Sequence, residues 1–251
     1  TYLDGTVDRT ITVQATDEDG TWSNTRTISV ADVAPVVELT GGDSVDEGGS
    51  YTLTLASITD PGNDTALSYT INWGDGNAEV VASLGSYSHT YADGTTSRTF
   101  SVLVTDEEGV HANAGTKTIT VNNVVPTASV SGPATVDEGS VYTLTVGAIL
   151  DPGTDTRSGY TIAWGDGSTD TLSPAQWAAA AGSFTHTYAD GAASPTITVS
   201  TTDEDGTTVL GTQAVTVNDV APSASLSGPA TVDEGSVYTL TVGAILDPGT
   251  D

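Results

Sequence analysis

The chain has 251 residues, with 33 acidic and only 5 basic side chains, and a formal net charge of −28 at pH 7. Such a surface repels phosphate backbones and anionic lipid, which argues against binding to nucleic acid or to a membrane surface. Because cysteine is absent, no disulfide can stabilise the chain and each domain must bury a hydrophobic core. No apolar run of about twenty residues is present, so this segment is not expected to insert into a membrane.

Short motifs recur along the chain and divide it into repeats of roughly ninety residues, the size of a small β-sandwich. They are a Trp-Gly-Asp-Gly motif, a Thr-Tyr-x-Asp-Gly motif and an acidic turn, found at 73–76 and 164–167, at 1–5, 90–94 and 187–191, and at 17–20, 106–109 and 203–206. Short connectors end in proline at Pro35, Pro126 and Pro222. Proline fixes its own φ and keeps the preceding residue extended, so these prolines indicate joints between domains.

The joints predict four parts in chain order. Residues 1–34 match the second half of a repeat, 35–125 and 126–221 are complete units, and 222–251 match the first half of a further repeat. Half a sandwich cannot bury a core of its own, so we expect the polypeptide to continue in both directions. The last thirty residues repeat the start of the preceding unit with only two differences. Copies this similar argue against a specialised site in any one of them.

Alternation of apolar residues with threonine or serine predicts β-strands in the complete units. The clearest runs are, in chain order, 51–55, 99–104, 118–121, 142–146 and 196–199. Clusters of Gly, Asp and Pro separate such runs and give roughly seven strands per unit. We therefore expect an all-β chain of tandem immunoglobulin-like β-sandwiches arranged end to end.

A helix is predicted only in the second complete unit, at 174–181. Ser173 can cap it, Pro174 occupies its first turn, alanines follow and Gly182 can end it. We expect Trp177 to pin this helix to the edge of the sandwich; contact with a partner is the alternative.

The ordered motifs resemble the PKD domain. The resemblance rests on Trp73-Gly74-Asp75-Gly76, His89-Thr90-Tyr91, Gly94, the alternating run 100–104 and Thr105-Asp106, and the second unit repeats the set from Trp164 to Asp203. Tryptophan stands where the family more often has phenylalanine, which leaves the fold unaffected. The resemblance implies an extracellular array, as in bacterial and archaeal surface proteins, adhesins and secreted multidomain hydrolases.

Four residues that recur in the two units are expected to serve the fold. The tryptophan fills the core, the aspartate organises the following turn, the tyrosine hydroxyl bonds nearby backbone and the histidine is structural. They are Trp73, Asp75, His89 and Tyr91 in the first unit and Trp164, Asp166, His186 and Tyr188 in the second. His111 has no counterpart and is expected to be solvated.

Catalysis has little support in the sequence. No serine lies in a glycine-flanked nucleophile turn, cysteine is absent, and the histidines have no distinctive acid or metal partner motif. Carboxylates are plentiful, but they recur in every repeat, whereas an acid/base pair would be unique. We expect a protein that is not an enzyme.

The acidic turns support a more specific hypothesis. In an immunoglobulin-like order, the turns at 60–64 and 106–109 share one end of the sandwich, while 46–48, Asp75 and Asp93 share the other. Across the connector 122–126, carboxylates of successive units would then converge and repel one another by roughly 1–3 kcal/mol per pair at ~5 Å. Calcium, which takes six to eight oxygen ligands, would turn that repulsion into a clamp. The connectors also look somewhat like cadherin junctions, which bind calcium.

The predicted cofactor is therefore Ca²⁺, and exposed acidic turns without a metal are the alternative. The candidate ligands are Asp46, Glu47, Asp60, Asp64, Asp106, Glu108, Asp151, Asp155, Asp203, Asp205 and Asp219.

The sequence thus predicts a non-catalytic extracellular stalk or filament of a very large, adhesin-like bacterial surface protein, with calcium stiffening its junctions. One alternative is a self-assembling sheath or fibre, for which Trp22 and Trp177 are candidate contacts. Another is a carbohydrate-binding region of a secreted hydrolase. The expected partners are neighbouring repeats, other copies in a fibre, or extracellular polysaccharide at the cell surface.

Overall fold

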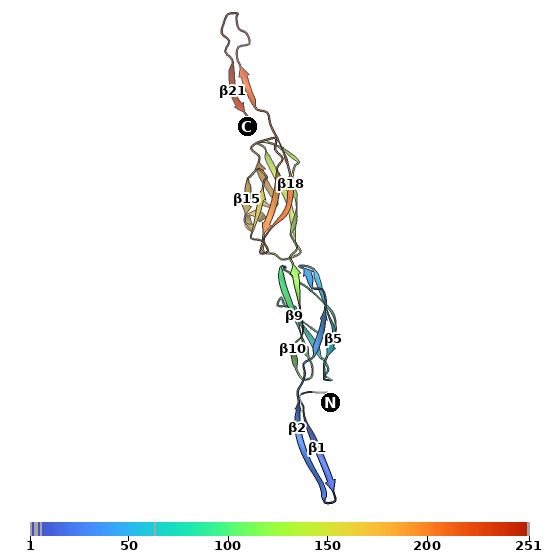
Figure 1. Cartoon of the computed structure of the whole chain (residues 1–251). Helices are drawn as coiled ribbons and strands as arrows, with labels where there is room; N and C mark the ends of the chain where they lie inside the picture. The colour runs from blue at the N-terminus through green and yellow to red at the C-terminus, as the bar shows by residue number, and fades with distance from the viewer. Residues whose placement is uncertain (1, 3–4, 6, 63, 250–251) are drawn as a thin grey trace. The chain divides into compact units, whose positions relative to one another are not determined.

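The computed structural model describes the chain except for residues 1, 3–4, 6, 63 and 250–251 (Figure 1). It divides into two compact units, Thr1–Val124 and Val125–Asp251. Among the described residues both are built from β-strands, with a single short helix in the second. The predicted all-β, immunoglobulin-like class is confirmed.

Unit 1 contains a hairpin followed by a β-sandwich. Its strands are β1 (Val7–Asp17), β2 (Gly20–Val30), β3 (Val36–Thr40), β4 (Ser44–Asp46), β5 (Ser50–Thr59), β6 (Ser68–Asn72), β7 (Ala78–Val81), β8 (Gly85–Thr90), β9 (Thr96–Thr105) and β10 (Val110–Asn122). The hairpin is β1-β2, and the sandwich has the sheets β3-β5-β8 and β4-β10-β9-β6-β7. The β4–β10 pair is parallel and the other pairs are antiparallel. Because β3 and β4 pair in different sheets, the first strand region of the sandwich joins both layers.

Unit 2 repeats this arrangement and ends in a two-stranded piece. Its elements are β11 (Thr127–Ser131), β12 (Thr135–Asp137), β13 (Val141–Leu150), β14 (Gly159–Ala163), β15 (Thr169–Leu172), α1 (Pro174–Ala180), β16 (Ser183–Thr187), β17 (Thr196–Thr202), β18 (Thr207–Ala214), β19 (Thr216–Asn218), β20 (Ser223–Ser227) and β21 (Thr241–Leu246). The sheets are β11-β13-β16 and β15-β14-β17-β18, with the parallel pair β12-β19 and the antiparallel pair β20-β21.

Apolar and polar side chains alternate along the strands, and the apolar ones form the core. In β5, Tyr51, Leu53 and Leu55 are buried, while Thr52 between them is exposed. Each buried side chain of this size contributes roughly 1.5–3 kcal/mol. Every complete sandwich has a cluster of its own, drawn from residues 37–121 in unit 1 and from residues 142–217 in unit 2.

The strand pairs near the chain ends leave uncovered the positions that the complete sandwiches bury. Ile11 and Phe100 are equivalent in the repeat, yet their exposed fractions are 44% and 0%. Tyr238 and Tyr142 are likewise equivalent, with 47% and 1% exposed. A two-stranded piece has no second layer to cover its apolar face.

Helix α1 lies between β15 and β16 and follows local capping rules. The Ser173 side chain accepts from the backbone N–H of Gln176, and the Gln176 side chain accepts from the Ser173 N–H, which is a capping box. Ala181 ends the helix in the left-handed region with φ of 50°. Trp177 stacks on Tyr160 at a ring separation of 4.2 Å and also contacts Phe184. These contacts fasten the helix to the sandwich.

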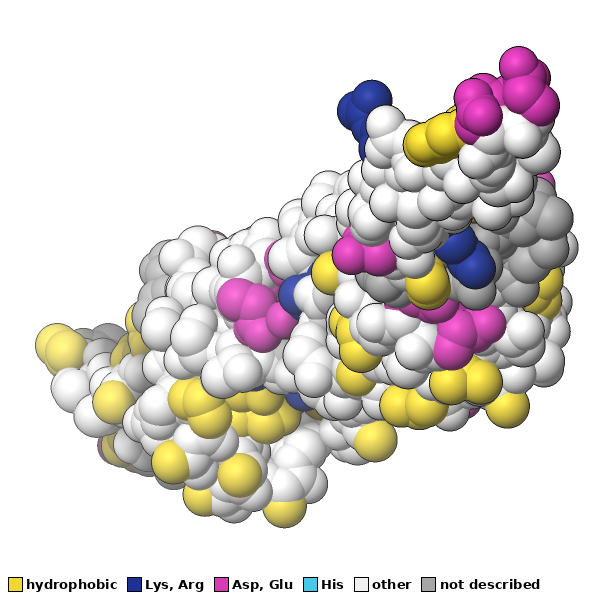
Figure 2. Space-filling view, turned by 90° about the horizontal axis from the view of Figure 1, so that it is seen from below, with side chains coloured by type: hydrophobic (Ala, Val, Ile, Leu, Met, Phe, Trp, Pro, Cys, Tyr) yellow, Lys and Arg dark blue, Asp and Glu magenta, His cyan; other side chains and the backbone are white. Residues whose placement is uncertain are grey.

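Much of the surface is neither charged nor hydrophobic. On the face shown in Figure 2, white atoms surround separate groups of acidic side chains in magenta. This matches a sequence rich in threonine, serine and glycine. No helix in the described part of the chain has the length and apolar character needed to cross a membrane.

Candidate cation sites and the repeated aromatic–acid cluster

Trp73, Asp75, His89 and Tyr91 meet in the sandwich of unit 1, and we refer to them as the aromatic–acid cluster. The His89 ring lies parallel to Trp73, 4.8 Å away with an interplanar angle of 11°, and its edge meets Tyr91. His89 Nε2 is 2.7 Å from Asp75 Oδ2. The Tyr91 hydroxyl donates to the Trp73 carbonyl at 2.9 Å. The cluster therefore ties β8 to the turn that follows β6.

Unit 2 builds the same cluster from Trp164, Asp166, His186 and Tyr188. The stacked rings are 4.7 Å apart at 12°, the histidine–aspartate distance is 2.7 Å, and the tyrosine hydroxyl donates to the Trp164 carbonyl at 3.1 Å. The predicted roles of the tryptophans, tyrosines and aspartates are confirmed. Each histidine also pairs with the aspartate of the Trp-Gly-Asp-Gly motif, a partner that no sequence motif indicated.

The cluster shifts the pKa of its acids. Burial raises the pKa of Asp75, but hydrogen bonds from His89 and Asn77 outweigh it and hold the pKa at about 2. Burial also raises the pKa of Asp166, but hydrogen bonds from Ser168 and His186 outweigh it and hold the pKa at about 2. Burial, reinforced by the nearby aspartate charge, raises the pKa of Tyr91 and Tyr188 to about 12. These shifts favour a charged aspartate beside a neutral tyrosine.

A first group of acids lies at one end of the unit 1 sandwich, where the β5–β6 loop meets the β9–β10 turn. Carboxylate oxygens of Asp64, Glu107 and Glu108 all lie within 4.8 Å of one another. Glu107 also accepts from the Thr65 N–H at 2.8 Å. Asp60 accepts from the backbone within its own loop. The predicted grouping of the 60–64 and 106–109 turns is thus present within unit 1.

His111 lies against this end and is not solvated, contrary to the prediction. Its side chain is 11% exposed, with Nε2 2.7 Å from Asp106 Oδ2 and Nδ1 3.7 Å from Asp32 Oδ2. Asp106 also accepts from Glu108 and Gly109 N–H groups. The hydrogen bond to Asp106 is the main cause that raises the pKa of His111, and the charges of Asp32 and Asp60 add to it.

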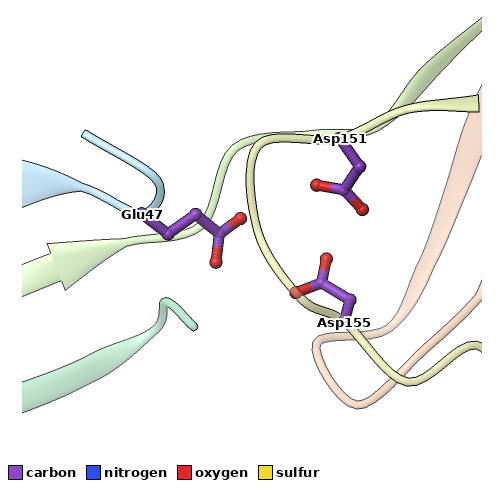
Figure 3. A group of neighbouring side chains, drawn as sticks. All are labelled: Glu47, Asp151 and Asp155. Carbon is purple, nitrogen blue, oxygen red and sulfur yellow. The ribbon is translucent and has the colours of Figure 1, made fainter. Parts of the chain in front are cut away.

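The equivalent end of unit 2 has a different cation. Asp151 is 4% exposed in its side chain and lies 2.5 Å from Arg157 Nη2. Asp155, on the same loop, has a carboxylate oxygen within 4.8 Å of a carboxylate oxygen of Asp151. A carboxylate oxygen of Asp155 also lies within 4.8 Å of one of Glu204. Figure 3 shows the carboxylates of Asp151 and Asp155 turned toward each other across this loop. In the acidic turn, Asp203 accepts from Asp205 and Gly206 N–H groups at 3.0 Å.

A second group of acids lies at the other end of each sandwich, beside the outgoing connector. In unit 1, Asp46 accepts from the Asn122 side chain at 3.0 Å, and Glu47 accepts from the Val124 N–H at 2.8 Å. Glu47 is only 1% exposed. In unit 2, Asp219 is exposed on the connector.

Sequence reasoning missed three residues of these sites. Glu107 and its equivalent Glu204 close the acidic loops by accepting from Thr65 and Thr156 N–H groups. Arg157 was not recognised as a cation within the cluster, although it lies only two residues after Asp155. Since a loop of this length can fold back on itself, the short spacing was the available signal.

Comparison with known proteins finds a similarity over part of the chain. Residues 32–121 match the family model of the PKD domain. No curated protein sequence matches the chain. Among solved structures, the fibronectin(III)-like modules of CbhA from Clostridium thermocellum are similar, with 14% identity over 72% of this chain and 93% of that chain and a TM-score of 0.29. The match over 32–121 and the motif set quoted above agree: the first complete sandwich of this chain is similar to the PKD domain, and its motifs recur in the second.

Proposed function

We propose that the chain is a non-catalytic structural array that acts as an extracellular stalk or filament of a large bacterial surface protein. The supporting observation is the aromatic–acid cluster, which performs the same structural task in both sandwiches. Trp73 and Trp164 each stack on a histidine, and the backbone carbonyl of each accepts a hydrogen bond from a tyrosine hydroxyl. The motif residues that could have marked a ligand site are thus occupied in holding the fold.

Separate cores support the same proposal. Each sandwich buries its own aromatic and aliphatic cluster, so each can fold and bear load as one element of an array. Length is then gained by adding copies, which fits the near-identity of residues 126–155 and 222–251. The partners in this proposal are neighbouring repeats of the same chain.

Calcium stiffening of the junctions is the finer part of the proposal. The acids at the ends of the sandwiches outnumber the cations beside them: unit 1 has Asp60, Asp64, Asp106, Glu107 and Glu108 with His111, and unit 2 has Asp151, Asp155, Asp203, Glu204 and Asp205 with Arg157. Carboxylate oxygens on loops are the ligands that Ca²⁺ takes in flexible sites.

Small-angle scattering of the chain with calcium and with EDTA tests the proposal. Calcium is expected to increase the maximum dimension and to reduce flexibility, and Asp151→Asn with Asp155→Asn is expected to weaken this response. An unchanged scattering curve would contradict calcium stiffening and would leave the prolines as the source of stiffness. A compact particle both with calcium and with EDTA would contradict the proposal of a stalk.

A further inference from the structure

Glu138 is a buried carboxylate in unit 2, next to the connector. It is 1% exposed, its N–H donates to the Asn218 carbonyl at 3.0 Å, and its Oε1 accepts from the Val220 N–H at 2.9 Å. Its second oxygen, Oε2, is buried and has no hydrogen-bond partner among the described residues. One half of the carboxylate therefore holds the connector, and the other half is unsatisfied.

Glu47 repeats this arrangement in unit 1. It is 1% exposed, its N–H donates to the Asn122 carbonyl at 2.9 Å, and its Oε1 accepts from the Val124 N–H at 2.8 Å. Its Oε2 also lacks a hydrogen-bond partner within the described part of the chain, as does the buried Oδ1 of Asn123 on the connector. The same unpaired oxygen thus occurs in both sandwiches.

The 190–191 loop packs against the unpaired oxygen of Glu138. A methyl group on Gly191 would lie 2.6 Å from Glu138 Oε2 and 2.4 Å from the Cα of Asp219, so this glycine lets the 190–191 loop approach both acids. Asp219 stands at the repeat position of Asn123, which places a carboxylate where unit 1 has the unpaired amide oxygen. Asp190 and Asp93 directly precede the equivalent glycines of this loop.

Among the described residues, no positive side chain forms an ion pair with Glu47 or Glu138. In the described ranges, the ion pairs of lysine, arginine and histidine involve other acids. A buried anion without a counter-charge is strongly unfavourable, because its desolvation is not repaid. A cation bound to Oε2 would supply both the missing charge and the missing contact.

We propose that Glu47 and Glu138 are ligands of a divalent-cation site at the connector end of each sandwich, completed by Asn123 and Asp219 respectively. The cation is Ca²⁺, because the donors are carboxylate and amide oxygens on loops, which suit its flexible coordination better than the strict octahedron of Mg²⁺. Bound there, the ion holds the connector to the sandwich through a residue already bonded to its backbone. This inference rests on the proposed calcium-stiffened array and assigns its cation to the buried glutamates.

Calorimetric titration of the full chain with CaCl₂, in a buffer with excess KCl, tests the assignment. The variant Glu47→Gln/Glu138→Gln keeps the shape and the carbonyl acceptor but removes the charge, and it is expected to lose calcium affinity by at least ~10-fold. Glu79→Gln, a matched change at an exposed position of β7, is expected to bind like the wild type. Asp219→Asn leaves both glutamates intact and is expected to weaken only the unit 2 site.

Thermal unfolding in EDTA separates a ligand role from a structural one. If the glutamates are cation ligands, the double glutamine variant is at least as stable as the wild type without calcium, since an unpaired buried charge has gone. A clear loss of stability in EDTA, with unchanged calcium binding, would overturn the inference. If calcium binding is lost instead in Asp151→Asn/Asp155→Asn alone, the inference fails and the proposed calcium function stands. If the wild type binds no calcium, both fail.

Discussion

His89 and His186 connect two parts of each sandwich that are far apart in the sequence. Each ring covers a tryptophan face and bonds the aspartate that shapes the next turn. The tripeptide repeat was enough to predict a structural histidine. Its partner could not be read from the sequence, because His89 and Asp75 meet only when β8 is placed across the sandwich from the turn after β6.

Truncation of one tryptophan is expected to unfold only its own sandwich. Trp73 and Trp164 are 2% and 1% exposed, and loss of a buried aromatic costs roughly 3–5 kcal/mol, a large share of a small domain's stability. In Trp73→Ala, amide hydrogen exchange should become fast across β3–β10 and stay slow across β11–β19. Trp164→Ala should give the reverse pattern. Native-like protection in the altered sandwich would show that the ring is dispensable for the fold.

Acid should destabilise both sandwiches between about pH 4 and pH 2. The folded pKa of Asp75 and of Asp166 is about 2, against an ordinary value of 3.8. A lowered folded pKa stabilises the protein above the unfolded value, and this stability is lost as pH falls through the folded one. The loss is roughly 1–2 kcal/mol per aspartate, measurable as a lower urea midpoint at pH 2.5. Asp75→Asn/Asp166→Asn should be less stable at pH 7 and less sensitive to acid. A variant that is as acid-sensitive as the wild type would assign the effect to other carboxylates.

At the scale of elements, the two sandwiches pair a buried aspartate with different cations at the same end. Asp106 pairs with His111 on β10 in unit 1, whereas in unit 2 Asp151, which stands at the repeat position of Asp60, pairs with Arg157 before β14. The repeat places Ala66 at the position of Arg157 and Thr208 at the position of His111. Of these two cations in the described residues, only the histidine of unit 1 titrates near neutral pH.

Unit 1 is expected to lose stability as pH rises above about 6.5, whereas unit 2 keeps its stability there. The Asp106 hydrogen bond raises the folded pKa of His111 above 6.5, so its contribution is complete below that value and disappears as pH rises through the folded pKa. The loss is up to about 1 kcal/mol for a partly accessible pair. Hydrogen exchange at pH 6 and pH 8.5 in EDTA, resolved for each sandwich, measures this loss of stability. The rates are corrected for the faster base-catalysed exchange at the higher pH.

A double substitution at positions 66 and 111 is the matched control. Ala66→Arg with His111→Thr gives unit 1 the residues of unit 2, and its stability should become independent of pH over the same window. Persistent pH dependence in this variant would place the titrating group elsewhere.

Strand content was predictable from local pattern, but layer assignment was not. Runs such as 51–55 and 142–146 alternate, and the structure buries their apolar members. The separation of β3 from β4, each in a different sheet, depends on long-range pairing with β5 and with β10. The acidic loops show the same limit, since turn chemistry predicted where they lie while the side chains of Glu107 and Arg157 decide their contacts. The unpaired oxygens of Glu47 and Glu138 follow from burial, which no spacing in the sequence reveals.

At the scale of the whole molecule, a net charge of −28 makes self-repulsion a general property of the chain. Monovalent salt should therefore raise the melting temperature in EDTA by screening exposed carboxylates, with most of the gain complete by about 0.15 M, where the screening length is about 8 Å. The same charge should prevent retention on DNA or anionic vesicles in moderate salt without divalent ions.

Calcium is expected to stabilise the chain more than sodium does at the same ionic strength. Screening depends on ionic strength, so it predicts equal melting temperatures when CaCl₂ is compared with NaCl at the same ionic strength. A bound ion adds stability by mass action, about 2.7 kcal/mol at one hundred times the dissociation constant for each site. The comparison should be made over a fixed background of 0.15 M KCl, where screening is nearly saturated. MgCl₂ at the same concentration is the control for divalent screening, because Mg²⁺ keeps its water shell and fits flexible carboxylate loops poorly. Equal melting temperatures in the three salts would mean that the acids act only as a solvated surface, whereas a gain confined to calcium would identify specific sites.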